Sequence, residues 1–396
     1  MTCRAVHALR PRALVPTGRR FLTSASPWGA SGRRLQCIDC HAAGEPARVV
    51  TGGLPHIPGV SMRAKRHFMM QHHDSLRKLL LLEPRGYPCQ NANFVLPPSP
   101  SCPTASFGVV IAEQGFIYPA MSGHNMMCVA TALLETGMVP MSEPLTEFDL
   151  ETPAGLVRIS ADCKNGKALQ ISIQNVPSFC RAADMDVIID VPEVGKVMVD
   201  IAYGGMFYAI VDAGQMDLEL IPSKGREICR LGEMIKTACR EQHPVNHPEF
   251  DYPGCDILVF TDQQHLGPGG RLFGKNVVVM SNGTLAWDEP DTWTGMIDRS
   301  PCGTGTSAVM AQLHARGRLQ MGQDFVHEGI LGTQFLGRLL EQTVIAGKGE
   351  EVSAVVPSIS GRAWITQFCE VVCDPSDPFP EGYVMGDIWA ADTEKQ

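Results

Sequence analysis

The 396-residue sequence has no run of apolar residues close to the ~20 that a membrane-spanning helix requires. Positive charge is in short supply, with 33 Lys and Arg against 42 Asp and Glu, and the net charge of −9 argues against a nucleic-acid-binding surface. Low-complexity linkers are also missing, so the two domains that this length allows should pack directly on each other. We therefore expect a globular protein that binds neither nucleic acid nor membrane.

Acidic residues are absent before Asp39, whereas seven arginines lie among the first 35 residues. An arginine-rich, acid-free start is typical of a mitochondrial transit peptide. The same composition fits a disordered extension, or translation from an upstream start codon in a cytoplasmic protein. Residues 1–35 are therefore expected to precede the folded part, and a mitochondrial and a cytoplasmic location are both open.

The 14 cysteines are scattered through a chain too long for a small disulfide scaffold, so we expect free thiols. The segment Cys37–His41 has the spacing of a c-type haem attachment site, but nothing else in the sequence indicates export or a haem pocket. The segment His72–Asp74 (His-His-Asp) lies in a predicted helix, where adjacent side chains point in different directions. We therefore predict no metal and no cofactor.

The most informative stretch runs from Asp298 to Ser307 and reads DRSPCGTGTS. Pro301 restricts the backbone, glycines allow close approach, and helix formers follow, so Cys302 is predicted on a loop directly before a helix. The positive end of the helix dipole stabilises anions, which predicts a thiol pKa lowered from about 8.5 toward neutral and a group able to act as acid or base. The alternative is a cysteine packed as a small hydrophobic residue.

A second stretch, Met121–Leu134, repeats this arrangement, with Ser122 directly before Gly123 and a helix of small and apolar residues. Two such turns in separate halves of the chain indicate two similar lobes that face each other across a cleft. A substrate carboxylate held between two helix N-termini would present its α-carbon to a residue on either face. This arrangement suits α-proton chemistry without a cofactor.

The remaining periodicity predicts a mixed α/β protein. Amphipathic helices are expected over Met62–Leu82 and Lys224–Gln242, and the helix after Cys302 is expected to end near Arg316. Strands are expected at 92–96, 107–112, 148–152, 155–161, 168–174, 187–190, 196–202, 257–260 and 276–280, and again in the tail from 354 to 374.

Five ordered motifs make the chain resemble the proline racemase family, which includes proline racemase, hydroxyproline 2-epimerase and trans-3-hydroxy-L-proline dehydratase. The motifs are Asp39–Val50 (DCHAAGEPARVV), Leu82–Gly86 (LEPRG), Met121–Asn125 (MSGHN), Val199–Gly205 (VDIAYGG) and Asp298–Thr306 (DRSPCGTGT). The resemblance covers about residues 36 to 390 and is specific to the family, but much less specific to the reaction.

The resemblance implies an α/β (α+β) fold with two pseudo-symmetric lobes, similar to diaminopimelate epimerase, each a curved, mostly antiparallel sheet around a central helix. Residues 36–158 and 358–390 are expected in the first lobe and residues 159–357 in the second. The resemblance also implies a homodimer and a small-molecule substrate, either hydroxyproline or proline.

In the family, two cysteines stand on opposite faces of the substrate α-carbon, and the matching residues here are Ser122 and Cys302. The resemblance further implies that Asp298 binds the ring ammonium, although a role in capping the turn before Pro301 is the alternative. The other expected substrate contacts are Gly123, His124, Gly303 and Thr304, which would hold the carboxylate, and Asp256.

Serine at position 122 departs from the family pattern, because a neutral hydroxyl is a poor base beside a thiolate. Dehydration of trans-3-hydroxy-L-proline needs less symmetry, since its α-hydrogen and hydroxyl lie on the same ring face and one residue can serve both. We therefore predict a hydro-lyase that forms pyrroline-2-carboxylate, with 4-hydroxyproline 2-epimerase or proline racemase as the alternative. A catalytically weak relative that binds imino acids is a third possibility. Whether Ser122 or Cys302 removes the α-proton is open at this stage.

Overall fold

The computed structural model describes residues 33–249, 254–255, 257–347, 349–374, 376–386 and 388–389. The segment expected to be a transit peptide or extension, residues 1–35, therefore lies outside the described residues except for its last three. Asp256, expected to contact substrate, also lies outside them. In the described part, no helix is both long and apolar enough to cross a membrane.

The described residues form a mixed α/β structure that is richer in strands than in helices. Its helices are α1 (Met62–His72), α2 (Asp74–Leu81), α3 (Gly123–Glu135), α4 (Gly225–Gln242) and α5 (Gly303–Ala315). The strands of the first half are β1 (Arg33–Ala42), β2 (Glu45–Gly52), β3 (Ala92–Leu96), β4 (Phe107–Ala112), β5 (Leu145–Thr152), β6 (Gly155–Lys164), β7 (Lys167–Gln174), β8 (Val187–Val191) and β9 (Gly195–Tyr203). Those of the second half are β10 (Phe207–Asp212), β11 (Ile257–Thr261), β12 (His265–Leu266), β13 (Leu272–Ser281), β14 (Gly295–Ile297), β15 (Asp324–Glu328), β16 (Gln334–Gly347), β17 (Glu350–Gly361) and β18 (Ala363–Cys373).

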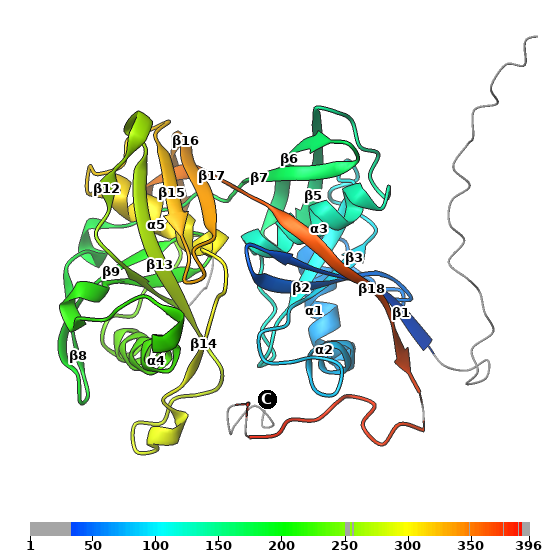
Figure 1. Ribbon diagram of the computed structural model, residues 1–396, viewed down its shortest axis with the longest axis horizontal. Helices are drawn as coiled ribbons and strands as arrows, with labels where there is room; N and C mark the ends of the chain where they lie inside the picture. Colours follow the sequence, from blue (N-terminus) through cyan, green and yellow to red (C-terminus); the bar gives the residue numbers. More distant parts are fainter. Residues whose placement is uncertain are drawn as a thin grey trace, which may run out of the picture.

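The first lobe is built around α3 (Figure 1). Most of its side chains are small or apolar on every face of the helix, and its residues from Gly123 to Leu134 are buried. It packs against β1, β2, β7 and β18, so the sheet encloses it, while α1 and α2 lie outside the sheet beside β3 and β4. A helix with no polar face is stable only in such an enclosed position.

The second lobe repeats this plan around α5, whose residues from Gly303 to Leu313 are buried. It packs against β9, β10, β16 and β17. The amphipathic helix α4 lies on a different part of the sheet, against β8, β11, β13 and β14 (Figure 1). The two pseudo-symmetric lobes expected from the sequence are therefore present.

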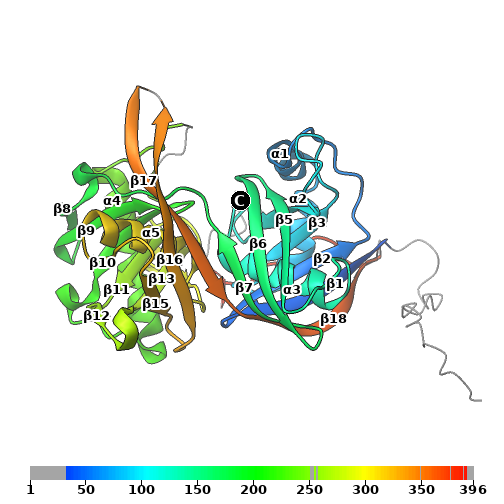
Figure 2. The same cartoon turned by 90° about the horizontal axis from the view of Figure 1, so that it is seen from above.

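Strand β17 connects the lobes (Figure 2). It pairs with β16 from the second lobe along its length, and its last residues, Ser358–Gly361, also pair with β7 of the first lobe. The chain then continues into β18, which pairs with β1 of the first lobe. The domain boundary expected after residue 158 falls inside β6. Because β6 lies between β5 and β7, and β7 packs on α3, the structure places residues up to Gln174 with the first lobe.

The first family motif is largely structural. Arg48 forms two hydrogen bonds to the Asp39 carboxylate, both 2.8 Å long, across the β1–β2 pair. The same guanidinium donates to the carbonyl oxygens of Leu80 and Arg85, at 3.1 and 2.8 Å, and so attaches the end of α2 to the sheet. A bidentate arginine–carboxylate pair with its remaining donors satisfied is a stable buried element.

Several expected elements match the structure residue for residue, while others were not predicted. The strands expected at 92–96 and 107–112 are β3 and β4. The single helix expected over Met62–Leu82 is two helices, because His73 leaves the helical conformation at φ −136° and ψ 24°. Asp74 then starts α2 and forms an ion pair with Arg77 one turn later at 2.7 Å, a local interaction that the apolar periodicity does not reveal.

Candidate active site

The N-termini of α3 and α5 are in direct backbone contact, and this contact brings the two halves of the site together. A Cβ added to Gly303 would lie 2.8 Å from the Cα of Gly123, and the converse substitution gives the same distance. Only residues without a side chain allow this approach. Ser122 and Cys302 are the residues directly before these two glycines, so the structure places both predicted catalytic residues at one inter-lobe site.

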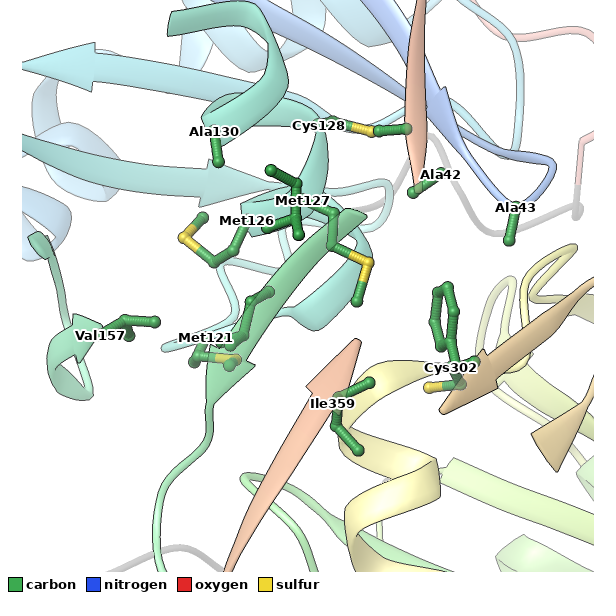
Figure 3. Close-up of a cluster of buried hydrophobic side chains, with 14 of the residues drawn as sticks. Ala42, Ala43, Met121, Met126, Met127, Cys128, Ala130, Val157, Cys302 and Ile359 are labelled. Carbon is green, nitrogen blue, oxygen red and sulfur yellow. The ribbon is translucent and has the colours of Figure 1, made fainter. Parts of the chain in front are cut away.

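Both side chains are nearly enclosed, with exposed fractions of 9% for Ser122 and 7% for Cys302. Figure 3 shows Cys302 at the edge of an apolar cluster that includes Met126 and Met127 from α3 and Ile359 from β17. Electrostatic interactions in such a water-poor site are stronger than at the protein surface.

On the Ser122 face, a polar network surrounds the hydroxyl. Asn125 Nδ2 donates to Ser122 Oγ at 3.1 Å, and Asn93 Nδ2 in turn donates to Asn125 Oδ1 at 2.7 Å. Ser122 Oγ also lies 3.2 Å from His124 Nδ1. Since Asn125 occupies a lone pair of the hydroxyl, the Ser122 proton is available for His124 Nδ1.

His124 is well suited to exchange this proton. Burial lowers the pKa of its imidazole, and the Asp298 carboxylate raises it by less, so the neutral ring is favoured. Its other nitrogen, Nε2, is buried and has no hydrogen-bond partner in the part of the chain that the structure describes. Within the described residues, Nε2 is therefore free to bind a ligand.

On the Cys302 face, the thiol lies at the N-cap of α5 with a left-handed φ of 63°. Gly305 N–H donates to Sγ at 3.4 Å, and the Tyr208 hydroxyl lies 3.4 Å from the same sulfur. The Tyr208 hydroxyl is also 2.6 Å from Thr304 Oγ1. Tyr208, Thr304 and Cys302 therefore form a compact buried group.

The predicted lowering of the Cys302 pKa is wrong for the buried thiol. Burial raises the pKa of Cys302 well above its ordinary value, and the Asp298 carboxylate raises it further. Hydrogen bonds from Tyr208, Gly305 and Thr304 lower it by less. The physical reason is that one long N–H···S contact at the helix start does not replace the water that burial removes.

Asp298 is buried and lies between these groups. Its Oδ1 accepts hydrogen bonds from the Ser300 backbone N–H and hydroxyl, both at 2.8 Å, and Ser300 Oγ accepts from Cys302 N–H at 3.0 Å. Asp298 thus caps the turn that carries Cys302, which is one of its two expected roles. Binding of a ring ammonium stays a prediction.

The Val199–Gly205 motif positions α5. A side chain at Gly204 would collide with the carbonyl oxygen of Thr304 and with the backbone of Ala308. Asp200 accepts a 2.6 Å hydrogen bond from Gln312 and pairs with Arg316 at the far end of the same helix. The absence of a side chain at Gly204 therefore lets α5 pack closely against the end of β9.

A cavity of about 820 Å³ between the lobes borders this site. Its lining includes Glu113, Phe116 and Tyr118 from the first lobe and Met206 and Asn282 from the second. Gly205, another lining residue, contacts Thr304, since an added Cβ would lie 3.0 Å from Thr304 Cγ2. Gly205 therefore lies between the cavity and Thr304 at the start of α5, and the cavity is in the size range of small-molecule sites.

Residues of the two sequence patterns with metal-like or haem-like spacing make other contacts in the structure. Within the described residues, no group of three or more His, Cys, Asp or Glu side chains is arranged to hold a metal ion. Asp74 pairs with Arg77 and accepts from the Tyr118 hydroxyl at 3.0 Å. Cys37 and Cys40 are buried in β1, and burial is the main cause that raises the pKa of each thiol to about 12. Every cysteine in the described part of the chain is a free thiol.

Three residues beside the site were missed from the sequence. Asn125 orients Ser122, Tyr208 contacts Cys302, and Glu45 accepts a hydrogen bond from the backbone N–H of Arg299 at 2.7 Å. Asn125 and Glu45 belong to two of the quoted motifs, so their motif membership was the available signal. Tyr208 lies on β10, a strand that the sequence did not predict, and no pattern pointed to it.

Similar sequences are found among known proteins. Residues 37–384 match the family described as "Proline racemase". The chain is 40% identical to a 4-hydroxyproline 2-epimerase of Streptosporangium roseum over 354 residues, which is 89% of this chain and 99% of that protein. It is 38% identical to a proline racemase of Clostridioides difficile over 353 residues, which is 89% of this chain and 98% of that protein.

Two solved structures share the fold over almost the whole chain. One is a hydroxyproline epimerase from Agrobacterium vitis with bound trans-4-hydroxy-L-proline, with a TM-score of 0.78 and 36% identity over 91% of this chain and 98% of that one. The other is a probable proline racemase from Agrobacterium radiobacter K84 with bound carbonate, with a TM-score of 0.79 and 36% identity over 91% of this chain and all of that one (100%). The expected two-lobed, diaminopimelate epimerase-like fold is confirmed.

Proposed function

The chain belongs to the proline racemase family, and from this premise we propose that it epimerises 4-hydroxyproline at the α-carbon. The observation that carries the proposal is the pairing of Cys302 with a Ser122–His124 couple across the Gly123–Gly303 contact. Each face of a bound α-carbon then has a group that can take or give a proton. The names of the similar proteins favour the same chemistry.

Substrate binding in this proposal uses the two helix starts and Asp298. The carboxylate lies at the N–H groups of Gly123, His124, Gly303 and Thr304, where the helix dipoles favour an anion. The ring ammonium pairs with Asp298. This pairing removes the repulsion that Asp298 exerts on a Cys302 thiolate, so substrate binding makes the thiolate easier to form.

The buried pKa shifts indicate which group acts first. Burial favours a neutral Cys302 thiol and a neutral His124 imidazole over the thiolate–imidazolium pair. In the neutral form, Ser122 takes the α-proton while its own proton passes to His124 Nδ1, and Cys302 donates its proton to the opposite face of the carbanion. The thiolate–imidazolium form that results performs the reverse reaction, so each form of the enzyme accepts one epimer.

Dehydration of trans-3-hydroxy-L-proline is the second candidate, and the chemical inequality of the two faces favours it. A single residue takes the α-hydrogen as a proton and returns it to the leaving hydroxyl on the same ring face. Water departs, and the resulting enamine tautomerises to pyrroline-2-carboxylate. This route needs one proton-carrying group, whereas epimerisation needs both Ser122 and Cys302.

A substrate panel in deuterated water distinguishes these reactions. The panel contains trans-4-hydroxy-L-proline, cis-4-hydroxy-D-proline, trans-3-hydroxy-L-proline and L-proline, followed by NMR and chiral chromatography. Epimerisation predicts α-deuterium in the inverted 4-hydroxyproline, and dehydration predicts a pyrroline product from the 3-hydroxy compound.

Two variants assign the residues. Cys302→Ala is expected to abolish turnover in either case, while Ser122→Ala abolishes only epimerisation if Cys302 alone drives dehydration. Binding without exchange or product for any compound would refute both reactions and indicate an imino-acid binder.

A further inference from the structure

The turn between β1 and β2 joins the first lobe to the loop that carries Cys302. Ala43 and Gly44 form this turn with left-handed φ values of 53° and 110°. Thr333 Oγ1 of the second lobe donates to the Ala43 carbonyl oxygen at 2.7 Å. A Cβ on Gly44 would lie 2.8 Å from Leu331 Cδ1 and 3.4 Å from the Arg299 carbonyl oxygen, so the turn is in close contact with the second lobe.

Glu45, the first residue of β2, makes the most direct of these contacts. Its side chain is fully buried, and Oε2 accepts the Arg299 backbone N–H at 2.7 Å. Its other oxygen, Oε1, has no hydrogen-bond partner among the described residues. A buried carboxylate with one unsatisfied oxygen is costly, whereas an uncharged carboxyl group is tolerated much better.

The surroundings disfavour ionisation of this carboxyl group. Burial raises the pKa of Glu45 well above its ordinary value, and the Asp298 and Glu113 carboxylates raise it further, while the Arg299 backbone N–H and guanidinium lower it by less. The remaining titratable neighbours are Tyr87, Cys89 and Cys128, each of which has its own pKa raised in part by Glu45.

Hydrogen bonds within the Asp298–Cys302 segment connect the Glu45–Arg299 contact to the residue that carries the thiol. Arg299 stands between Asp298 and Ser300, whose side chains bond to each other at 2.8 Å. Ser300 Oγ accepts the Cys302 N–H at 3.0 Å. Holding the Arg299 amide therefore restrains the whole segment from Asp298 to Cys302 against the first lobe.

We propose that Glu45 is a positioning residue for the α-proton reaction: its carboxyl group docks the Asp298–Cys302 segment on the first lobe and so sets the distance from Cys302 to the Ser122 face. The inference rests on the proposed function of Cys302 and Ser122. Glu45 acts through Arg299, not by touching the substrate. Ionisation of Glu45 would place a second negative charge beside Asp298 and weaken this docking.

Two substitutions at Glu45 and one matched control test the inference. Glu45→Gln keeps an uncharged acceptor for the Arg299 amide, Glu45→Ala removes it, and Thr333→Val removes an inter-lobe hydrogen bond of the same 2.7 Å length that does not reach the Cys302 segment. Each variant is measured for kcat and KM over a pH series. Amide hydrogen exchange of the peptide that contains Arg299 supplies a readout that needs no substrate.

Glu45→Ala is expected to lower kcat about 100-fold, as for a misplacement of roughly 1 Å, and to speed exchange at Arg299. The kcat of Glu45→Gln should stay within about threefold of that of the natural protein, because the hydrogen bond from the Arg299 amide is retained. This variant should also lose the part of the decline in kcat at alkaline pH that ionisation of Glu45 causes. Thr333→Val should leave kcat and Arg299 exchange unchanged.

If Glu45→Ala has the same kcat and the same amide hydrogen exchange at Arg299 as the natural protein, the inference is overturned. A kcat of Glu45→Gln as low as that of Glu45→Ala would also overturn it, because the acid proton and not the docking would then be what matters. An equal loss of kcat in Thr333→Val would overturn it too, because the effect would then not be specific to the Glu45 contact. If the natural protein turns over no prolyl compound, the proposed function fails, and the exchange experiment still decides whether Glu45 docks the segment.

Discussion

Substitution of Gly303 by alanine tests the central contact of the site. The new Cβ would lie 2.8 Å from Gly123 Cα and 3.4 Å from Gly123 N, both backbone atoms that cannot rotate away. Restoring ordinary contact of about 3.8 Å requires the two helix starts to separate by roughly 1 Å. A displacement of that size between catalytic groups costs about 100-fold in rate, or ~2.7 kcal/mol of activation free energy.

The free energy of unfolding should fall by no more than about 2.5 kcal/mol in this variant. Overpacking costs about 1–3 kcal/mol, while alanine gains roughly 0.5–1 kcal/mol over glycine in a helix. The control is Gly225→Ala at the start of α4, where the residue has φ −52° and ψ −41° and a Cβ would meet only Ile297 Cδ1 at 3.6 Å. This control should gain about 0.5–1 kcal/mol in the free energy of unfolding with unchanged activity.

The assay for both glycine variants is kcat/KM from α-deuterium exchange, together with urea unfolding. A Gly303→Ala protein with natural kcat/KM would refute the reasoning, because the two faces would then not depend on the close approach of the helices. Loss of folding would show as a changed unfolding transition and is separated in that way from loss of geometry.

Three further predictions concern the charged and hydroxyl groups around the thiol. Asp298→Asn removes a carboxylate that raises the Cys302 pKa, so iodoacetamide should alkylate Cys302 faster than in the natural protein at the same pH, as measured by mass spectrometry; an equal or slower rate contradicts this. Tyr208→Phe removes the hydroxyl 3.4 Å from Cys302 Sγ and should lower kcat about tenfold, with little change in KM, whereas unchanged kcat would show that the contact is only packing. Burial, followed by the Asp298 charge, raises the pKa of Glu113 from 4.5 to about 8, so the folded state holds a proton that the unfolded state has lost, and this contribution to the free energy of unfolding declines as pH rises from 4.5 to 8. Urea unfolding of Glu113→Gln across this range should lack that decline, and an identical pH dependence in the variant would disprove the assignment.

The local sequence was sufficient to predict both loop-to-helix turns. Ser122 and Cys302 each precede a glycine and a run of small helix formers, and the helices begin directly after them at Gly123 and Gly303. Strands β3 and β4 were predicted to the residue because short apolar β-forming runs flanked by turn residues have few other stable conformations. These features depend on neighbours in the chain, so they can be derived from the sequence.

The properties of the site depended on residues that are distant in the chain. The predicted direction of the Cys302 pKa was wrong because enclosure of the thiol, which no local pattern reports, outweighs the helix start. Tyr208 reaches Cys302 across 94 positions, and Glu45 reaches Arg299 across 254. The first contact forms when β10 and the start of α5 pack within the second lobe, and the second forms only when the two lobes pack on each other.

Motif resemblance was enough to identify the family and its two-lobed fold, and local glycine placement was enough to predict that Ser122 and Cys302 stand directly before helices. The contact between Gly123 and Gly303 and the hydrogen bond from Arg299 N–H to Glu45 are seen only in the folded protein. The physical reason is that burial and long-range hydrogen bonds set the protonation and position of these groups, and both arise only when distant segments pack together.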